Sequence, residues 1–234
     1  MLSQTLTKVS LRLLHQRTKD LYFTLLCKAT LPNYFAHRLR SRLSSASANP
    51  LHLHLGCGPN YLPGFLNIDA NPQRKVDLWL DVRNGLPFAD GTVDSIYSTH
   101  MLEHLYHDEL GRLFSECRRV LKPRGGVRFI VPNLETAITA YLQHKSEWFD
   151  DYPRKLQSVG GRFANFIFCD GQHRTAFDYG HLRELLNNAG FDHTLHLQEG
   201  QSSLYHSDVP PYAPGDQRDL AHSLYVEAFK EAPA

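Results

Sequence analysis

The feature that most constrains this chain is a glycine-rich turn, Gly56-Cys57-Gly58, placed directly after the apolar segment 51–55. A strand that runs into Gly-x-Gly presents backbone N–H groups to a ligand at a point where no Cβ blocks the approach. Asp69 ends the next predicted strand, residues 65–68, where a carboxylate can accept hydrogen bonds from two ribose hydroxyls. The pattern therefore predicts a nucleoside-type ligand at the carboxyl edge of a parallel sheet.

Strand-like and helix-like segments alternate along the rest of the chain, as a parallel sheet with crossover helices requires. Helices are predicted at 107–121 and 179–189, because apolar residues recur there at helical spacing. Strands are predicted at residues 51–55, 65–68, 76–80, 93–98, 126–131, 191–198 and 220–229. The prediction is a single α/β domain with a doubly wound, mostly parallel, seven-stranded sheet.

Two segments depart from this alternation. Residues 1–48 hold eight Lys and Arg against the single acid Asp20, and the pattern of residues 6–26 predicts an amphipathic helix. This basic extension could cover the acidic domain 49–234, or it could lie on an anionic membrane. A role in binding a partner and a lack of fixed structure remain further alternatives. Residues 133–177 are rich in aromatic side chains and predict a substrate cap, a satellite helical layer, or both.

Composition excludes several classes of protein. With 42% hydrophobic residues, 21% charged residues and a net charge of +1, the chain resembles neither a disordered protein nor a dedicated nucleic-acid binder. Its four cysteines form no CxxC pair, and no apolar stretch reaches the length of a membrane span. We expect a cytoplasmic protein, with membrane contact limited to the extension. We expect no metal site, because the histidines show no convincing ligand spacing apart from His100 and His104.

The glycine turn suits S-adenosylmethionine (SAM) better than it suits a dinucleotide. A dinucleotide site needs a third glycine that lets the helix pack closely, and Tyr61 occupies that position. SAM carries an amino acid and a sulfonium but no phosphate, so it needs donors and acceptors at the turn and no phosphate cradle. A nicotinamide-dependent oxidoreductase is therefore disfavoured.

Five motifs in the expected order resemble those of class I SAM-dependent methyltransferases, in particular a small bacterial group associated with glycan and polysaccharide pathways. They are LHLGCGPN at 53–60, GFLNID at 64–69, LPFADGTVD at 86–94, MLEHL at 101–105 and RRVLKPRGG at 118–126. The match is weaker after residue 132, although residues 171–179 and 185–191 still resemble the group.

The resemblance implies a set of cofactor contacts. The backbone of Gly56, Cys57 and Gly58 would hold the methionine part and Asp69 the ribose hydroxyls, with Cys57 as a packing residue and not a nucleophile. The resemblance also implies that Asp81 and the Val82 N–H contact the adenine. Ser98 and His100, at the end of the fourth strand, complete the set of cofactor residues, and His100 would lie beside the sulfonium.

Transfer of the methyl group to a hydroxyl acceptor would need a base. The candidate catalytic residues are His100, His173 and Glu103, with His104 and Asp178 nearby in the sequence. Glu103 and His104 could instead cap the helix that starts near residue 107. Arg174 could bind substrate, or it could pair with Asp170 or Asp178.

The sequence thus favours a methyltransferase that acts on a small-molecule or saccharide acceptor. The alternative is a SAM-binding regulator or scaffold without turnover. Nucleic acid is not an expected acceptor, because Ser98-Thr99-His100-Met101 stands where base-amino methyltransferases have Asn/Asp-Pro-Pro-Tyr/Phe. The sequence makes no prediction of the oligomeric state.

Overall fold

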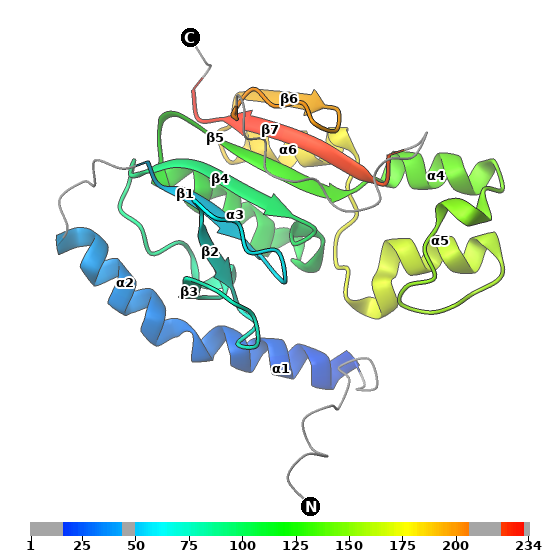
Figure 1. The fold of residues 1–234 in the computed structure, drawn as a ribbon, viewed down its shortest axis with the longest axis horizontal. Helices are drawn as coiled ribbons and strands as arrows, with labels where there is room; N and C mark the ends of the chain where they lie inside the picture. Colours follow the sequence, from blue (N-terminus) through cyan, green and yellow to red (C-terminus); the bar gives the residue numbers. More distant parts are fainter. Residues whose placement is uncertain (1–15, 44–49, 206–220, 232–234) are drawn as a thin grey trace, which may run out of the picture.

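The computed structural model describes residues 16–43, 50–205 and 221–231, and these form one seven-stranded sheet flanked by helices (Figure 1). The strand order is β3-β2-β1-β4-β5-β7-β6, and only β7 runs antiparallel to its neighbours. The strands are β1 (His52–Leu55), β2 (Leu66–Asp69), β3 (Leu78–Trp79), β4 (Val93–Thr99), β5 (Leu121–Pro132), β6 (His193–Leu197) and β7 (Ser223–Phe229). The predicted doubly wound fold is confirmed.

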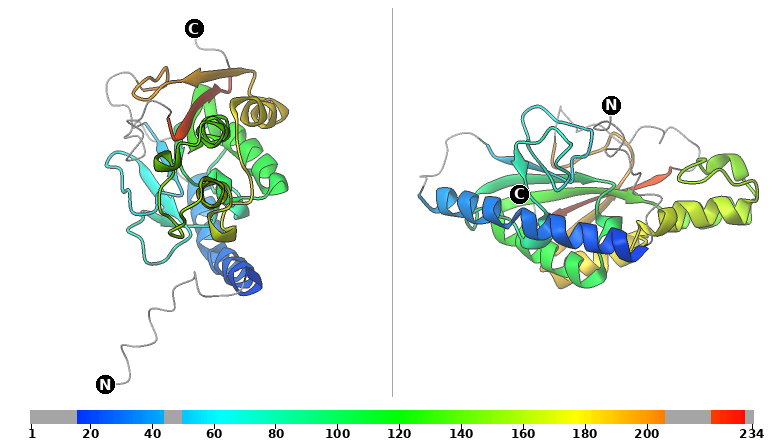
Figure 2. Two further views of the ribbon diagram at one scale, coloured as in Figure 1. Left: turned by 90° about the vertical axis from the view of Figure 1, so that its right-hand side faces the viewer. Right: turned by 90° about the horizontal axis from the view of Figure 1, so that it is seen from below.

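Two amphipathic helices, α3 (His107–Val120) and α6 (Tyr179–Asn188), lie on the same face of the sheet (Figure 2). The buried stripe of α3 repeats at helical spacing, with acids in its first turn and arginines in its last. The helix ends one residue earlier than predicted, and β5 begins at Leu121 and not at residue 126. The reason is that Leu121 already pairs with Val93, and the register then shifts, so that Ser95 pairs with Gly126 and β5 holds the extra residues.

The connection between β1 and β2, residues 56–65, contains no helix. The face of the sheet opposite α3 is covered there by a small apolar cluster. Its buried members are Tyr97, Ile130 and Tyr225, and Leu62, Phe65 and Leu197 pack against them. Because a short loop replaces a crossover helix, the glycine turn lies close to the second strand.

The extension forms two helices, α1 (Gln16–Ala29) and α2 (Leu31–Leu43), which dock along the β3 edge of the sheet (Figure 1). The Thr30 hydroxyl accepts from the backbone N–H of Asp81, and the Asn33 amide donates to the carbonyl of Trp79. Residues 16–43 therefore dock on the domain, which was one of the predicted alternatives. The prediction had one helix, at residues 6–26, and missed α2, and residues 6–15 of the predicted helix lie outside the described residues.

The docked extension still presents apolar side chains to solvent. Leu21, Leu25, Phe35 and Leu39 are each more than half exposed, so contact of this surface with a membrane stays a prediction. Within residues 16–43, 50–205 and 221–231, none of the helices is long and apolar enough to cross a bilayer.

The insertion after β5 projects beyond the end of the sheet as α4 (Leu134–Leu142) and α5 (Val159–Phe168) (Figures 1 and 2). Short 3₁₀ turns follow each helix, at Ser146–Trp148 and Cys169–Gly171. A separate core formed by Ala137, Ala140, Trp148 and Phe149 holds the helices together. The insertion is therefore a satellite helical layer with its own core.

Candidate active site

The glycine turn and Asp69 are joined directly. Gly56 and Gly58 have φ values of 64° and 53°, a left-handed conformation that favours glycine. The Asp69 carboxylate accepts from the Gly58 N–H at 2.8 Å and from the Asn71 N–H at 2.7 Å. Because each carboxylate oxygen has two lone pairs, Asp69 keeps acceptor capacity for two ligand hydroxyls.

The two glycines differ in the space around them. A Cβ on Gly56 would lie 2.3 Å from the Cγ of Met101, so Gly56 allows Met101 to pack onto the turn. A Cβ on Gly58 would meet no atom within 4 Å, and the Asp69 side chain beside it is partly exposed. An open backbone beside an exposed acceptor fits the amino acid and ribose groups of SAM, so the residues present suit the predicted cofactor.

Cys57 is a packing residue within this turn. Its side chain is 1% exposed, and its backbone N–H donates to the carbonyl of Ile68. Burial, together with nearby carboxylates, raises the pKa of the Cys57 thiol to about 12. A thiol held in its protonated form is a poor nucleophile, as the sequence analysis expects.

Two of the expected cofactor residues have their side chains engaged elsewhere. Both oxygens of Asp81 accept hydrogen bonds from Arg83, and Asp81 also caps the short 3₁₀ turn that contains Val82. The Ser98 hydroxyl is buried and donates to the carbonyl of Leu55 in the neighbouring strand. The Ser98 hydroxyl therefore joins β1 to β4, and adenine contacts near Asp81 and Val82 stay a prediction.

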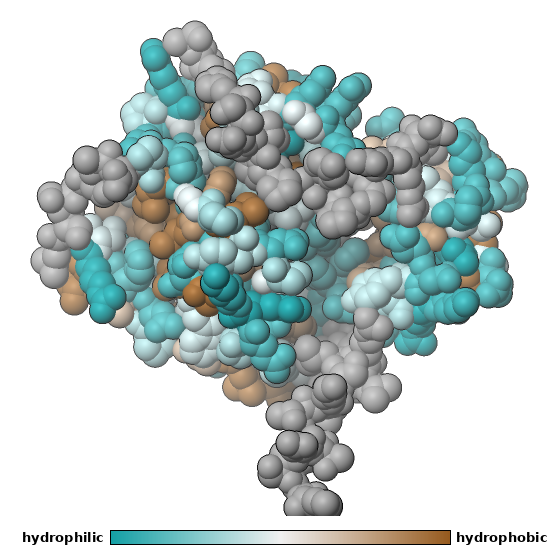
Figure 3. All heavy atoms as spheres, viewed as in Figure 1, coloured by the Kyte–Doolittle hydropathy of each residue, from teal (hydrophilic) through white to brown (hydrophobic). Residues whose placement is uncertain are grey.

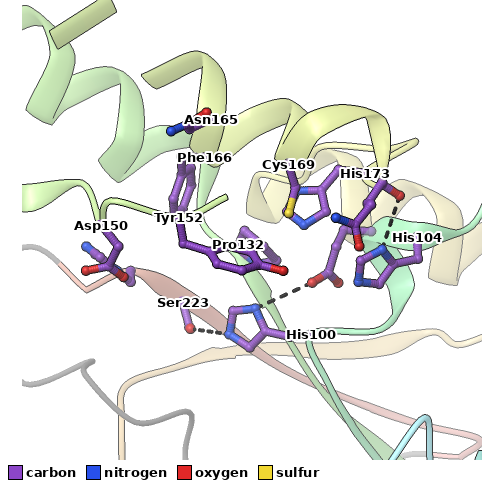
Figure 4. A pocket seen from close by; sticks show the side chains of 13 residues that line it. His100, His104, Pro132, Asp150, Tyr152, Asn165, Phe166, Cys169, His173 and Ser223 are labelled. Atoms are coloured by element: carbon purple, nitrogen blue, oxygen red, sulfur yellow. Dashed lines mark hydrogen bonds and ion pairs between the residues drawn. The ribbon is translucent and has the colours of Figure 1, made fainter. Parts of the chain in front are cut away.

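His100 lies at the carboxyl end of β4 with a left-handed backbone, φ 47°. Its backbone N–H donates to the carbonyl of Ile130, which holds this uncommon conformation in place. Its Nε2 lies 2.9 Å from the Ser223 hydroxyl, and its Nδ1 lies 3.4 Å from Oε1 of Glu103 (Figure 4). A side chain that is 36% exposed and held from both sides is well placed to face a substrate.

Glu103 is the most buried acid of this site, with a side chain that is 2% exposed. Burial by itself would raise its pKa, but the hydrogen bond from His100 and the charges of nearby imidazoles outweigh burial, so the pKa is lowered. Its backbone carbonyl accepts from the N–H groups of Arg174 and Thr175. Glu103 thus presents a carboxylate to the site and fastens the end of the insertion to the domain.

The acceptor pocket, as we call it, lies between the carboxyl end of the sheet and the insertion, with a volume of about 350 Å³ (Figures 3 and 4). It contains His100, Glu103, His104 and His173, three of which the sequence analysis named as candidate catalytic residues. Its other lining residues are Pro132, Asp150, Tyr152, Asn165, Phe166, Cys169, Gln172, His222 and Ser223. The insertion therefore forms a wall of this pocket as well as a satellite layer, and its role as a substrate cap stays a prediction.

His104 and His173 meet edge to face on one side of this pocket, with ring centroids 5.1 Å apart. Burial lowers the pKa of His173. Neither Glu103 nor His104 caps α3, because the 3₁₀ turn Leu102–His104 precedes that helix and Glu109 accepts from the Tyr106 N–H at its start. The capping alternative is therefore wrong, and both residues lie in the pocket.

Arg174 pairs with Asp20 of α1, and with neither of the two partners considered from the sequence. Asp170 instead pairs with Arg154, and Asp178 caps α6 through the His181 N–H. The sequence could not identify Asp20, because that contact requires the extension and the insertion to meet. The pair ties α1 to the segment that carries His173.

The structure adds pocket residues that sequence reasoning missed. Ser223 is the first residue of β7 and His222 precedes it, whereas Tyr152, Asn165 and Phe166 come from the insertion. The cluster of aromatic residues in 133–177 was the only signal for the second group. No local pattern marked Ser223, since its contact with His100 depends on the antiparallel return of β7.

Comparison with known proteins gives one family match, over part of the chain. A family model described as "Methyltransferase domain" matches residues 57–129, from the glycine turn to β5. No curated protein matches the sequence significantly.

Several solved structures also match this chain, at low sequence identity. A SAM-dependent methyltransferase from Thermotoga maritima is 14% identical, with 92% of this chain and 96% of that chain covered and a TM-score of 0.48. A SAM-dependent methyltransferase from Archaeoglobus fulgidus is 15% identical, with 89% and 99% covered and a TM-score of 0.46. A phosphoethanolamine N-methyltransferase from Haemonchus contortus, solved with SAM, is 14% identical, with 70% and 38% covered and a TM-score of 0.44.

The family match covers the segment that carries the glycine turn, Asp69 and His100, and the sheet around it has the class I order. The segment that carries the glycine turn, Asp69 and His100 is thus that of a methyltransferase domain.

Proposed function

We propose that the chain transfers the methyl group of SAM to a hydroxyl of a small polar acceptor, such as a saccharide, held in the acceptor pocket. The observation that carries this proposal is the position of His100 on the pocket wall. It stands at the end of β4, where ligands bind in open α/β sheets, and it has a buried carboxylate on one side and a hydroxyl on the other.

When bound, SAM supplies a methyl group that is activated for displacement from sulfur. A hydroxyl acceptor forms its new O–C bond as the C–S bond breaks, and its proton must pass to a base. The Glu103 carboxylate beside Nδ1 favours the tautomer that carries a proton on Nδ1. Nε2 of His100 is then the site that receives the acceptor proton, directly or through the Ser223 hydroxyl.

The pocket wall supports a polar acceptor with several hydroxyl groups. Carboxylate, amide and imidazole side chains converge on it, and they can both donate and accept hydrogen bonds. Tyr152, which is half exposed, and Phe166 give it aromatic surface against which a sugar ring could pack. The four cysteines, all within the described residues, form no disulfide with one another, which supports a reducing compartment such as the cytoplasm.

The test is methyl transfer from labelled SAM to a panel of saccharides, other alcohols and primary amines. His100→Asn should lower kcat by roughly 10²- to 10⁴-fold, the contribution of a positioned base, and should change the affinity for S-adenosylhomocysteine less than threefold. His144→Asn is the matched control, because His144 is exposed, lies outside the pocket and also has a left-handed backbone that asparagine tolerates. Transfer to amines alone, or full activity of His100→Asn, would contradict the proposal.

A further inference from the structure

We propose that Glu103, His104 and His173 form a binding site for a divalent transition-metal ion on the wall of the acceptor pocket. One potential ligand atom from each residue lies within 4.8 Å of the other two. From the sequence we expected no metal site, because the histidines show no convincing ligand spacing apart from His100 and His104. His173 is far from both Glu103 and His104 in the chain. The insertion brings it to the 3₁₀ turn that carries Glu103 and His104 (Figure 4).

Both imidazoles are fixed in the tautomer that a metal ion needs. Nδ1 of His104 lies 3.1 Å from the carbonyl oxygen of Gln172, and Nδ1 of His173 lies 3.1 Å from that of Ile167. A carbonyl oxygen can only accept, so each Nδ1 carries the proton, and the neutral ring keeps its lone pair on Nε2. Histidines that bind metals commonly donate their other N–H to a carbonyl or carboxylate in this way.

The third ligand is a buried carboxylate oxygen that lacks a donor. Oε1 of Glu103 faces His100, while Oε2 is fully buried and has no hydrogen-bond partner among the described residues. Leaving a buried charged oxygen without a partner costs free energy, and such groups are rare in folded proteins. A cation held between Glu103, His104 and His173 would satisfy Oε2 and leave the contact of Oε1 with His100 intact.

The kind of ligand decides the kind of ion. Two neutral imidazoles and one carboxylate suit Zn²⁺ and its first-row neighbours, whereas Mg²⁺ and Ca²⁺ prefer oxygen ligands. Metal–ligand bonds of about 2.1 Å in a tetrahedral site separate the ligand atoms by about 3.4 Å, so the three side chains must close by on the order of 1 Å. His104 is exposed, so its ring has room to shift toward the ion while Nδ1 keeps its bond to the Gln172 carbonyl.

Three protein ligands leave at least one coordination position open, which is the arrangement of catalytic metal sites. All three residues line the acceptor pocket, so the open position faces the space where the acceptor binds. The ion would hold an acceptor oxygen there and make its hydroxyl proton easier to remove. The exposed His104 gives solvent, and hence the ion, a route to the site.

The test measures metal binding to the full chain without any turnover. Protein stripped with a chelator is dialysed against Zn²⁺ or Mg²⁺ and the bound metal is determined. Wild type should bind one equivalent of Zn²⁺, and His104→Gln and His173→Gln should each weaken binding by at least 10- to 100-fold, the loss seen even for supporting partners. The matched control is His181→Gln, because His181 also bonds a backbone carbonyl through Nδ1 but lies outside the cluster.

Binding of S-adenosylhomocysteine shows which variants fold. If a variant fails to fold, the visible spectrum of wild type loaded with Co²⁺ provides the test, since ligation by two imidazoles in a site of low coordination number gives intense d–d bands. Absence of stoichiometric Zn²⁺ binding or of those bands, or unchanged affinity in the folded histidine variants, overturns the proposal. Failure to methylate any hydroxyl would contradict the proposed function and would leave the metal measurement unaffected.

Discussion

Replacing Asp69 by alanine should nearly abolish cofactor binding. The Asp69 carboxylate retains lone pairs for two ribose hydroxyls after it has accepted from the N–H groups of Gly58 and Asn71. Each hydrogen bond to a charged group contributes about 1.5–3 kcal/mol, so losing both costs about 3–6 kcal/mol. The dissociation constant for S-adenosylhomocysteine should therefore rise by about 150-fold to more than 10⁴-fold.

Titration calorimetry and thermal unfolding measure this change directly. At about 100 times its dissociation constant the ligand should stabilise wild type by roughly 2.7 kcal/mol, and Asp69→Ala should show almost none of this at the same concentration. The control is Asp77→Asn. Asp77 accepts from the Asn67 N–H at the opposite end of β2, so this variant should lose stability but bind normally. An affinity of Asp69→Ala within threefold of wild type would refute the assignment of Asp69 to the ribose.

Two further predictions concern stability. Burial lowers the pKa of His54 to about 4, whereas an unfolded histidine takes up a proton near 6.5, so the free energy of unfolding should fall by about 3 kcal/mol as pH drops from about 6.5 to 4. Urea titrations across that range should show a smaller loss of unfolding free energy in His54→Phe than in wild type. If the two proteins lost the same free energy as the pH fell, His54 would not be the group responsible. Glu227→Leu should lower the free energy of unfolding by about 3–5 kcal/mol, because it leaves the buried Arg128 guanidinium without its carboxylate partner. Arg154→Ala is the control: it removes an exposed ion pair and should lower the free energy of unfolding by less than about 1 kcal/mol. A loss below 1 kcal/mol for Glu227→Leu would show that the buried pair is not needed.

The parts of the fold that the sequence predicted are those set by local pattern. The apolar face of α3 and the charged residues at its ends predict a helix without knowledge of its tertiary contacts. The glycine turn before Asp69 likewise predicts the end of a strand. The second helix of the extension was missed because its contacts are scattered polar ones, such as that of Asn33 with the Trp79 carbonyl. Such contacts leave no periodic signal in the sequence.

In the candidate site, too, the residues marked by a local pattern could be predicted, and those brought together by tertiary contacts could not. His100 could be predicted because it follows a strand, and strand ends meet at one edge of a parallel sheet. That His173 meets His104, and that Ser223 meets His100, could not be predicted, because each contact joins segments whose relative position depends on the whole fold. Arg174 shows the limit most clearly, since both partners considered from the sequence were near neighbours and the actual partner is Asp20.

The place of β7 in the sheet has a consequence for how the protein is made on the ribosome. β7 is the last strand in chain order, yet it lies between β5 and β6 and pairs with both. Until residues 223–229 have emerged, β6 has no strand to pair with and one edge of β5 stays open to aggregation. Because β7 also carries Ser223 to His100, the nascent chain can bury its first strands early but cannot assemble the pocket until this late strand is inserted.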